Sequence, residues 1–157
     1  MVLDGCGLSA YHLSVVVGLN FLSVIAQNPA GGSIVNISSD LGLTAPDQRL
    51  YRKPGLPADQ QPVKPVTYSA VKAGLIGLTR YLATYWADRN VRCNALCPGG
   101  IENNQDAAFL REICSRIPMQ RMARADEYRG SLLFLLSVAS SYVNGAVIAA
   151  DGGRSAW

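Results

Sequence analysis

The residues best suited to chemistry in this chain are Tyr68 and Lys72, which begin and end the sequence YSAVK. In a helix, positions i and i+4 share a face, so the phenol and the ammonium can reach the same small volume. A nearby cation favours the phenolate form of a tyrosine and prepares it for proton transfer at neutral pH. The spacing therefore predicts an acid/base pair for an alcohol or a carbonyl, with an ordinary exposed helix pair as the alternative.

Three short apolar segments are typical of buried parallel strands, and each ends in residues of special chemistry. Residues 33–38 end in the hydroxyls of Ser38 and Ser39. Residues 91–96 lead into CPGG, where missing side chains let the backbone approach a flat ligand, and residues 146–150 lead into DGG. Ligands bind at the carboxyl ends of parallel strands. We therefore expect these strand ends to meet in one crevice beside the helix that carries the tyrosine.

Helical patterns separate the strands and predict an α/β domain with a mainly parallel sheet. Asp126 and Glu127 are expected to lie in the first turn of the helix at 125–139, where their negative charges stabilise its positive N-terminal end. Residues 43–66 contain five prolines and are too long for an ordinary connection, so they predict a functional loop or insertion. The expected helices cover residues 11–27, 67–87, 105–116 and 125–139.

The composition excludes several classes of protein. The length of 157 residues and 49% hydrophobic content suit one domain, and the scattered net charge of +3 does not indicate a nucleic-acid partner. The chain contains no run of 18 apolar residues, so no membrane span is predicted. Residues 13–26 are interpreted as a buried helix, with a signal peptide as the alternative. Four cysteines without paired spacing and a single histidine, His12, predict neither a metal site nor a Ser–His hydrolase. The cysteine usage favours a cytoplasmic protein.

Four stretches occur in an order typical of one family: GSIVNISS at 32–39, YSAVKAG at 68–74, VRCNALCPG at 91–99 and DGG at 151–153. Over about residues 30–153 the chain resembles the short-chain dehydrogenase/reductase family. Within that family it looks most similar to oxidoreductases of surface-polysaccharide or flagellin-sugar modification. The residues that carry this closer resemblance are APDQRLY at 45–51 and PVTYS at 65–69.

The resemblance implies a role for each residue of the crevice. Tyr68 becomes the general acid/base at the carbinol oxygen, and Lys72 supports its phenolate and hydrogen-bonds the nicotinamide ribose. Ser39 holds the substrate oxygen, and Ser38 is the weaker candidate for that role.

The resemblance implies NAD or NADP as the cofactor, without distinguishing the two. Pro98, Gly99 and the backbone of Ile101 are expected to border the nicotinamide, next to Tyr68 and Lys72. No metal is expected.

The resemblance also has a gap at the start of the chain. The family's glycine turn TGxxxGxG is not found in residues 1–32, the Asn-Asn-Ala-Gly motif is missing, and residues 1–16 match nothing in the family. The expected fold is a partial Rossmann-like doubly wound sheet of about three strands with flanking helices. The expectation is one truncated domain, 1–157, with 43–66 as a loop insertion and without the amino-terminal nucleotide-binding half.

The function implied by the resemblance is an NAD(P)-dependent oxidoreductase that interconverts a secondary alcohol and a ketone on a small, sugar-derived substrate. The alternative is a non-catalytic truncated remnant without a complete cofactor site. Apolar faces of residues 13–26 and 75–86 suit a homo-oligomer. If the insertion covers the crevice, its cations favour an anionic substrate, with a solvated surface loop as the alternative. These cations are Arg49, Arg52, Lys53 and Lys64.

Overall fold

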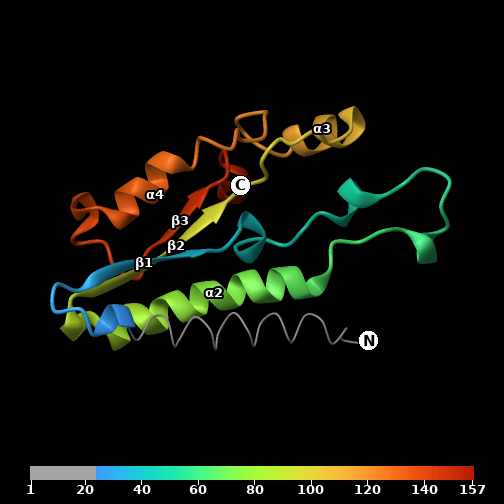
Figure 1. Cartoon of the computed structure of the whole chain (residues 1–157). Helices are drawn as coiled ribbons and strands as arrows, with labels where there is room; N and C mark the ends of the chain where they lie inside the picture. Colours follow the sequence, from blue (N-terminus) through green and yellow to red (C-terminus); the bar gives the residue numbers. More distant parts are fainter. Residues whose placement is uncertain (1–23) are drawn as a thin grey trace.

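The computed structural model describes residues 24–157, and its three strands form one parallel sheet in the order β1-β2-β3 (Figure 1). The strands are β1 (Gly32–Ile37), β2 (Val91–Pro98) and β3 (Val147–Ala150). The central strand is β2, which pairs with β1 along its first part and with β3 along its last part. This sheet confirms the expected α/β class with three parallel strands.

The helices that lie wholly within the described residues are α2 (Val66–Tyr85), α3 (Ala107–Cys114) and α4 (Arg129–Leu136). Helix α2 packs on one face and α4 on the other, so the sheet lies between them (Figure 1). Short 3-10 turns cover Asp40–Gly42, Gln48–Tyr51, Ala58–Gln60, Ala87–Arg89, Val138–Ser140 and Arg154–Ala156. No helix within residues 24–157 has the length and apolar character to cross a membrane.

Helix α2 is fixed to the sheet by an apolar face and by several polar contacts, one of which involves Thr79. Ile76, Thr79 and Leu82 recur at helical spacing and are buried. The Thr79 hydroxyl accepts a hydrogen bond from Asn36 of β1 at 2.9 Å and donates one to the Leu75 carbonyl. The link sets the position of α2 along β1, and therefore the position of Tyr68 near its start. The core on this side contains Ala26, Ile34, Leu82, Ala83, Trp86, Val91 and Cys93.

Strand β2 is longer than expected, because it continues through Cys97 and Pro98 instead of ending at Leu96. The neighbouring strand β3 supplies the reason: Pro98 pairs with Ala150, so the ladder extends to the end of β3. Proline lacks an N–H group and is tolerated at such an end position. Cys93 and Cys97 are fully buried, and burial raises the pKa of the Cys93 thiol to about 11. Both therefore behave as small apolar residues, as expected.

Helices α3 and α4 differ from the expectation at both ends, since they also end earlier, at Cys114 and Leu136. Helix α3 begins only after Asp106, whose carboxylate accepts a hydrogen bond from the Phe109 N–H and caps the helix. Helix α4 begins at Arg129, so Asp126 and Glu127 lie before it rather than in its first turn, and Glu127 forms an ion pair with Arg121. The expected helix at 11–27 lies mostly outside the described residues, of which 24–26 are helical.

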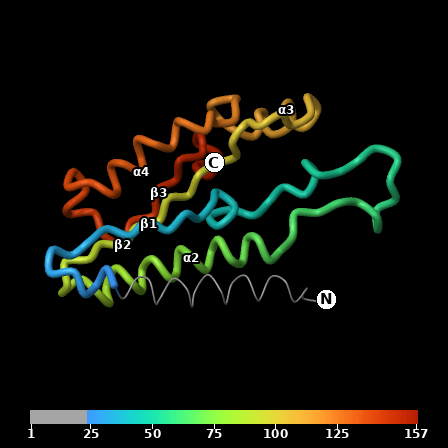
Figure 2. The backbone as a smooth tube through the Cα atoms, in the orientation of Figure 1, coloured from blue at the N-terminus to red at the C-terminus, as the bar shows by residue number. Residues whose placement is uncertain are grey.

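The loop expected at 43–66 ends at residue 65, where α2 begins, and it leaves the sheet at the end where α3 lies (Figure 2). The Gln48 side chain closes its base, because its amide oxygen accepts from the Lys64 N–H at 2.9 Å and its amide nitrogen donates to the Lys64 carbonyl. Leu50 is buried in a second apolar cluster with Ile113, Ile117 and Met122. The base of the loop is therefore packed against α3 and the chain after it, whereas residues 52–60 are exposed as in a surface loop.

Candidate functional site

A cavity of about 430 Å³ opens at the carboxyl ends of the three strands. Residues 38–41, 98–101 and 150–152, which end or follow β1, β2 and β3, line it together with Tyr68 of α2. The cavity thus brings together five of the six residues singled out from the sequence: Ser39, Tyr68, Pro98, Gly99 and Ile101.

Lys72, the sixth, is held between α2 and β1 and is not among the described residues that line the cavity. Its ammonium donates to the Ile37 carbonyl at 3.0 Å and lies 5.8 Å from the centre of the Tyr68 ring. Its backbone carbonyl accepts a hydrogen bond from the Ser38 hydroxyl at 2.7 Å. These contacts hold Lys72 close to Tyr68. The Ser38 hydroxyl helps to position α2.

Ser39 lines the cavity and also caps the 3-10 turn that follows β1. Its hydroxyl accepts from the Leu41 N–H at 3.2 Å and donates to the Asp40 carboxylate at 2.8 Å. The hydroxyl proton is directed toward Asp40, because an ionised carboxylate can only accept. The Ser39 hydroxyl therefore caps the turn and lines the cavity at the same time.

The sequence reasoning missed the ion pair between Asp40 and Arg154, which lines the same cavity. The two side chains are 5% and 14% exposed. A tight turn brings Arg154 to this place: the Asp151 carboxylate accepts from the N–H groups of Gly153 and Ser155, and Gly153 has a φ of +87°. An acidic residue directly after a strand was a usable signal for Asp40. No sequence signal linked it to an arginine 114 residues away.

Two further tyrosines line the cavity but differ from Tyr68 in their surroundings. Burial raises the pKa of both Tyr51 and Tyr128, and the negative charge of Asp40 acts in the same direction on each. Tyr128 is already occupied, since its hydroxyl donates to the Gly99 carbonyl at 2.9 Å. Tyr68 differs from both in carrying a lysine one helical turn away, and so remains the candidate acid/base.

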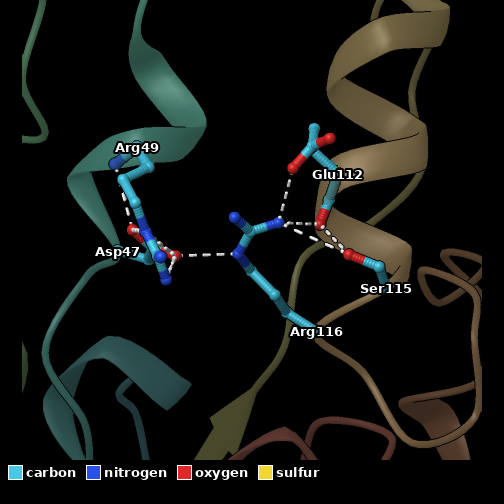
Figure 3. A network of polar contacts seen from close by, with 5 residues as sticks. All are labelled: Asp47, Arg49, Glu112, Ser115 and Arg116. Carbon is cyan, nitrogen blue, oxygen red and sulfur yellow. Dashed lines mark hydrogen bonds and ion pairs between the residues drawn. The ribbon is translucent and has the colours of Figure 1, made fainter.

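An ion-pair network joins the loop to helix α3 (Figure 3). The Asp47 carboxylate accepts hydrogen bonds from Arg49 and Arg116, each at 2.8 Å, and Arg116 also contacts Glu112 at 2.9 Å. The two guanidinium groups hold the pKa of the Asp47 carboxyl well below its usual range. The network and the apolar cluster around Leu50 therefore fix the base of the loop against the α3 side of the cavity.

The four cations of the loop do not act as one group. Lys64 alone among them lines the cavity. Arg49 is 72% exposed and paired with Asp47, and Arg52 and Lys53 are exposed. The expected cluster of four cations over the crevice is thereby reduced to a single lysine.

The Glu127 carboxylate on the cavity wall should make the protein sensitive to acid. Hydrogen bonds from Arg121, and from the Arg124 N–H, lower the pKa of Glu127 from 4.5 to about 2. A folded-state pKa below the unfolded one adds stability above pH 4.5, which is lost as pH falls toward 2. We expect Glu127→Gln to show a shallower fall in melting temperature than the wild type across this window.

The matched control is Glu102→Gln, which removes an exposed carboxylate that forms no ion pair among the described side chains. Its melting temperature should follow that of the wild type between pH 4.5 and pH 2. A Glu127→Gln curve parallel to the wild-type curve over this range would contradict the assignment.

Within residues 24–157, no three His, Cys, Asp or Glu side chains are grouped so that they could hold a metal ion. The polar groups at the cavity are instead hydroxyls, the Gln105 amide, the Asp151 carboxylate, one lysine and two arginines with carboxylate partners. Such groups suit hydrogen bonding and proton transfer to a small oxygenated molecule.

Comparison with known proteins identifies relatives of this site and fold. Residues 59–155 match the family model described as enoyl-(acyl carrier protein) reductase. The chain is 34% identical over 154 residues to 2-dehydro-3-deoxy-D-gluconate 5-dehydrogenase of Escherichia coli, covering 88% of this chain and 54% of that protein. It is 41% identical over 126 residues to 3-oxoacyl-[acyl-carrier-protein] reductase of Thermotoga maritima, covering 78% of this chain and 45% of that protein.

A solved structure shows the same arrangement of elements. A short chain dehydrogenase from Leptospira borgpetersenii with bound NAD+ superposes with a TM-score of 0.84 at 28% identity, covering 98% of this chain and 58% of that one. The chain spans about half the length of the curated relatives it matches. The family-model match, the sequence identities and the shared fold agree: the chain belongs to the short-chain dehydrogenase/reductase family.

Proposed function

We propose that this chain is an NAD(P)-dependent oxidoreductase that interconverts a secondary alcohol and a ketone in the cavity at the strand ends. The observation that carries the proposal is the meeting of Tyr68 and Ser39 in one cavity, with Lys72 fixed one helical turn from the tyrosine. Tyrosine, lysine and serine together can bind an oxygen and move its proton. The alternative is the non-catalytic remnant, and the binding of the cofactor decides between the two.

The proposed roles follow from the positions of the side chains. Tyr68 exchanges a proton with the carbinol oxygen, and its place at the start of α2 is set by the links of that helix to β1. The Lys72 ammonium adds positive charge near the phenol, 5.8 Å from the centre of its ring. Ser39 orients the substrate hydroxyl by accepting its hydrogen bond on the remaining lone pair of a hydroxyl that Asp40 and Leu41 hold in place.

The cofactor is proposed to be NAD or NADP. The residues present fit the nicotinamide end, because Pro98, Gly99 and Ile101 line the same cavity as Tyr68, and the glycine lets this strand end pack closely against Asp151. When bound, the cofactor supplies the hydride chemistry. Pro98, Gly99 and the Ile101 backbone are proposed to border the nicotinamide, with Lys72 at its ribose.

We propose a small sugar-derived substrate with a negative charge. A relative named for 2-dehydro-3-deoxy-D-gluconate supports a sugar acid, while a relative named for 3-oxoacyl-[acyl-carrier-protein] supports an acyl substrate. Apolar side chains form the larger part of the cavity wall, and the hydroxyls and the Lys64 ammonium among them favour the sugar acid. A role in polysaccharide or flagellin-sugar modification stays a prediction.

The organisation of the chain is also a proposal. We propose that residues 1–157 belong to one Rossmann-type domain with residues 43–66 as an insertion. A homo-oligomer is proposed through α2, whose Tyr81 and Tyr85 are exposed and stacked with ring centres 5.4 Å apart.

Cofactor binding by the full chain tests the proposed function. We expect millimolar NADH or NADPH to raise the melting temperature, because a ligand that binds only the folded state stabilises it. Cofactor fluorescence should change over the same concentrations, and a ketone substrate should then be reduced with loss of absorbance from the cofactor. An unchanged melting temperature and unchanged fluorescence with both cofactors would favour the non-catalytic remnant.

A further inference from the structure

Three cationic side chains line the cavity, and two of them already have carboxylate partners. Both terminal nitrogens of Arg121 bind the Glu127 carboxylate, at 2.6 and 2.7 Å. Arg154 is paired with the buried Asp40. These two guanidinium groups are therefore neutralised by the protein itself.

The third cation, Lys64, has no carboxylate within 4.0 Å among residues 24–157. Its ammonium lies 4.2 Å from the centre of the Tyr68 ring and the side chain is half-buried. The remaining carboxylate of the cavity, Asp151, accepts hydrogen bonds from the backbone N–H groups of Gly153 and Ser155. Lys64 thus brings an uncompensated positive charge next to the candidate acid/base.

The position of Lys64 is set by its surroundings. The Gln48 side chain binds both its N–H and its carbonyl, and Pro65 restricts its backbone to extended conformations. Lys53, on the same loop, offers a matched contrast. The Gln61 side chain holds its N–H and carbonyl in the same way, yet Lys53 is exposed and does not line the cavity.

We propose that Lys64 binds the carboxylate of a hydroxy-acid or keto-acid substrate. A partly buried cation without a counter-charge favours an anionic ligand over a neutral one. Since the Lys64 ammonium lies over the Tyr68 ring, a carboxylate bound there places a hydroxyl or carbonyl a few bonds away near the phenol. The inference rests on the proposed function and assigns its substrate a chemical class and an anchoring residue.

The competing explanation is that Lys64 only packs over the tyrosine ring. Cation–π contacts of this kind stabilise proteins without binding a ligand. The two explanations differ in their effect on ligand choice, because a packing role does not distinguish a carboxylate from a neutral group.

Calorimetric titration of the full chain with D-gluconate and D-glucitol tests the inference. The two molecules differ in the carboxylate alone, and each is titrated with and without NADH. We expect gluconate to bind about 10- to 100-fold more tightly than glucitol, as for one charge-assisted hydrogen bond. Lys64→Met should abolish this preference, Lys64→Arg should retain most of it, and the matched control Lys53→Met should retain all of it.

Equal binding of the two ligands by the wild type, or a preference that survives in Lys64→Met, would overturn the inference. The proposed redox function fails in a different way. A carboxylate preference that depends on Lys64, in a chain that does not bind NADH or NADPH, would support the anchoring role and contradict the oxidoreductase. Turnover without a preference for the carboxylate would support the oxidoreductase and contradict the anchoring role of Lys64.

Discussion

Replacing Tyr68 by phenylalanine should lower the rate of ketone reduction by about 100- to 10,000-fold, the range typical of a lost general acid or base. The substitution removes only the phenolic hydroxyl. It keeps the ring beneath the Lys64 ammonium and the helix that carries it. The rate is measured as NADH or NADPH oxidation by the full chain, and the melting temperature is measured alongside it to show that the fold is intact.

The matched control is Tyr81→Phe, which removes a hydroxyl from the same helix at a position that is 57% exposed. Its turnover should equal that of the wild type. Substrate reduction by Tyr68→Phe at the wild-type rate would assign the proton transfer to another group, with Tyr51 and Tyr128 as the other phenols on the cavity wall.

Removing the carboxylate of Asp40 should destabilise the protein by about 3–5 kcal/mol, because it leaves a buried guanidinium without its partner. Asp40 is 5% exposed, and besides Arg154 it binds the Ser39 hydroxyl and the Leu41 N–H. Asp40→Ala and Arg154→Met should each lower the free energy of unfolding measured in urea.

The double variant completes the test. When both partners are replaced, no buried charge remains unpaired, so the combined loss should be smaller than the sum of the two single losses. The control is the exposed pair Arg124–Asp126, whose side chains are 68% and 54% exposed. Its disruption by Asp126→Ala should cost about 0–1 kcal/mol. A similarly small cost for Asp40→Ala would contradict a structural role for the buried pair.

Local patterns in the sequence were enough to place the sheet and its main helix. Strand β1 and helix α2 begin and end within about two residues of the expected positions, because each has a strong pattern of its own. Strand β2 continued past Leu96 because β3 lies beside it, and α4 began late, with Glu127 before it in an ion pair with Arg121. Both differences involve contacts with other segments of the chain. The hydrophobic periodicity of a single segment does not reveal such contacts.

Some residues of the candidate site could be recognised from local sequence patterns, and others could not. Tyr68 and Lys72 are four positions apart on one helix, and Ser39 and Gly99 follow strands that could be recognised from the sequence. Their meeting follows from a general rule, since the carboxyl ends of parallel strands share one edge of a sheet. The sequence by itself therefore determined the α/β class, the family resemblance and five residues of the cavity wall.

Only the tertiary structure decided which charges face that cavity. Arg154 reaches Asp40 through a turn that a glycine with positive φ permits, and Lys64 reaches the Tyr68 ring because Gln48 closes the loop. Which side chains pair depends on distances between segments that sequence spacing does not encode. For that reason the sequence suggested four loop cations, and the structure left one lysine without a carboxylate partner at the cavity.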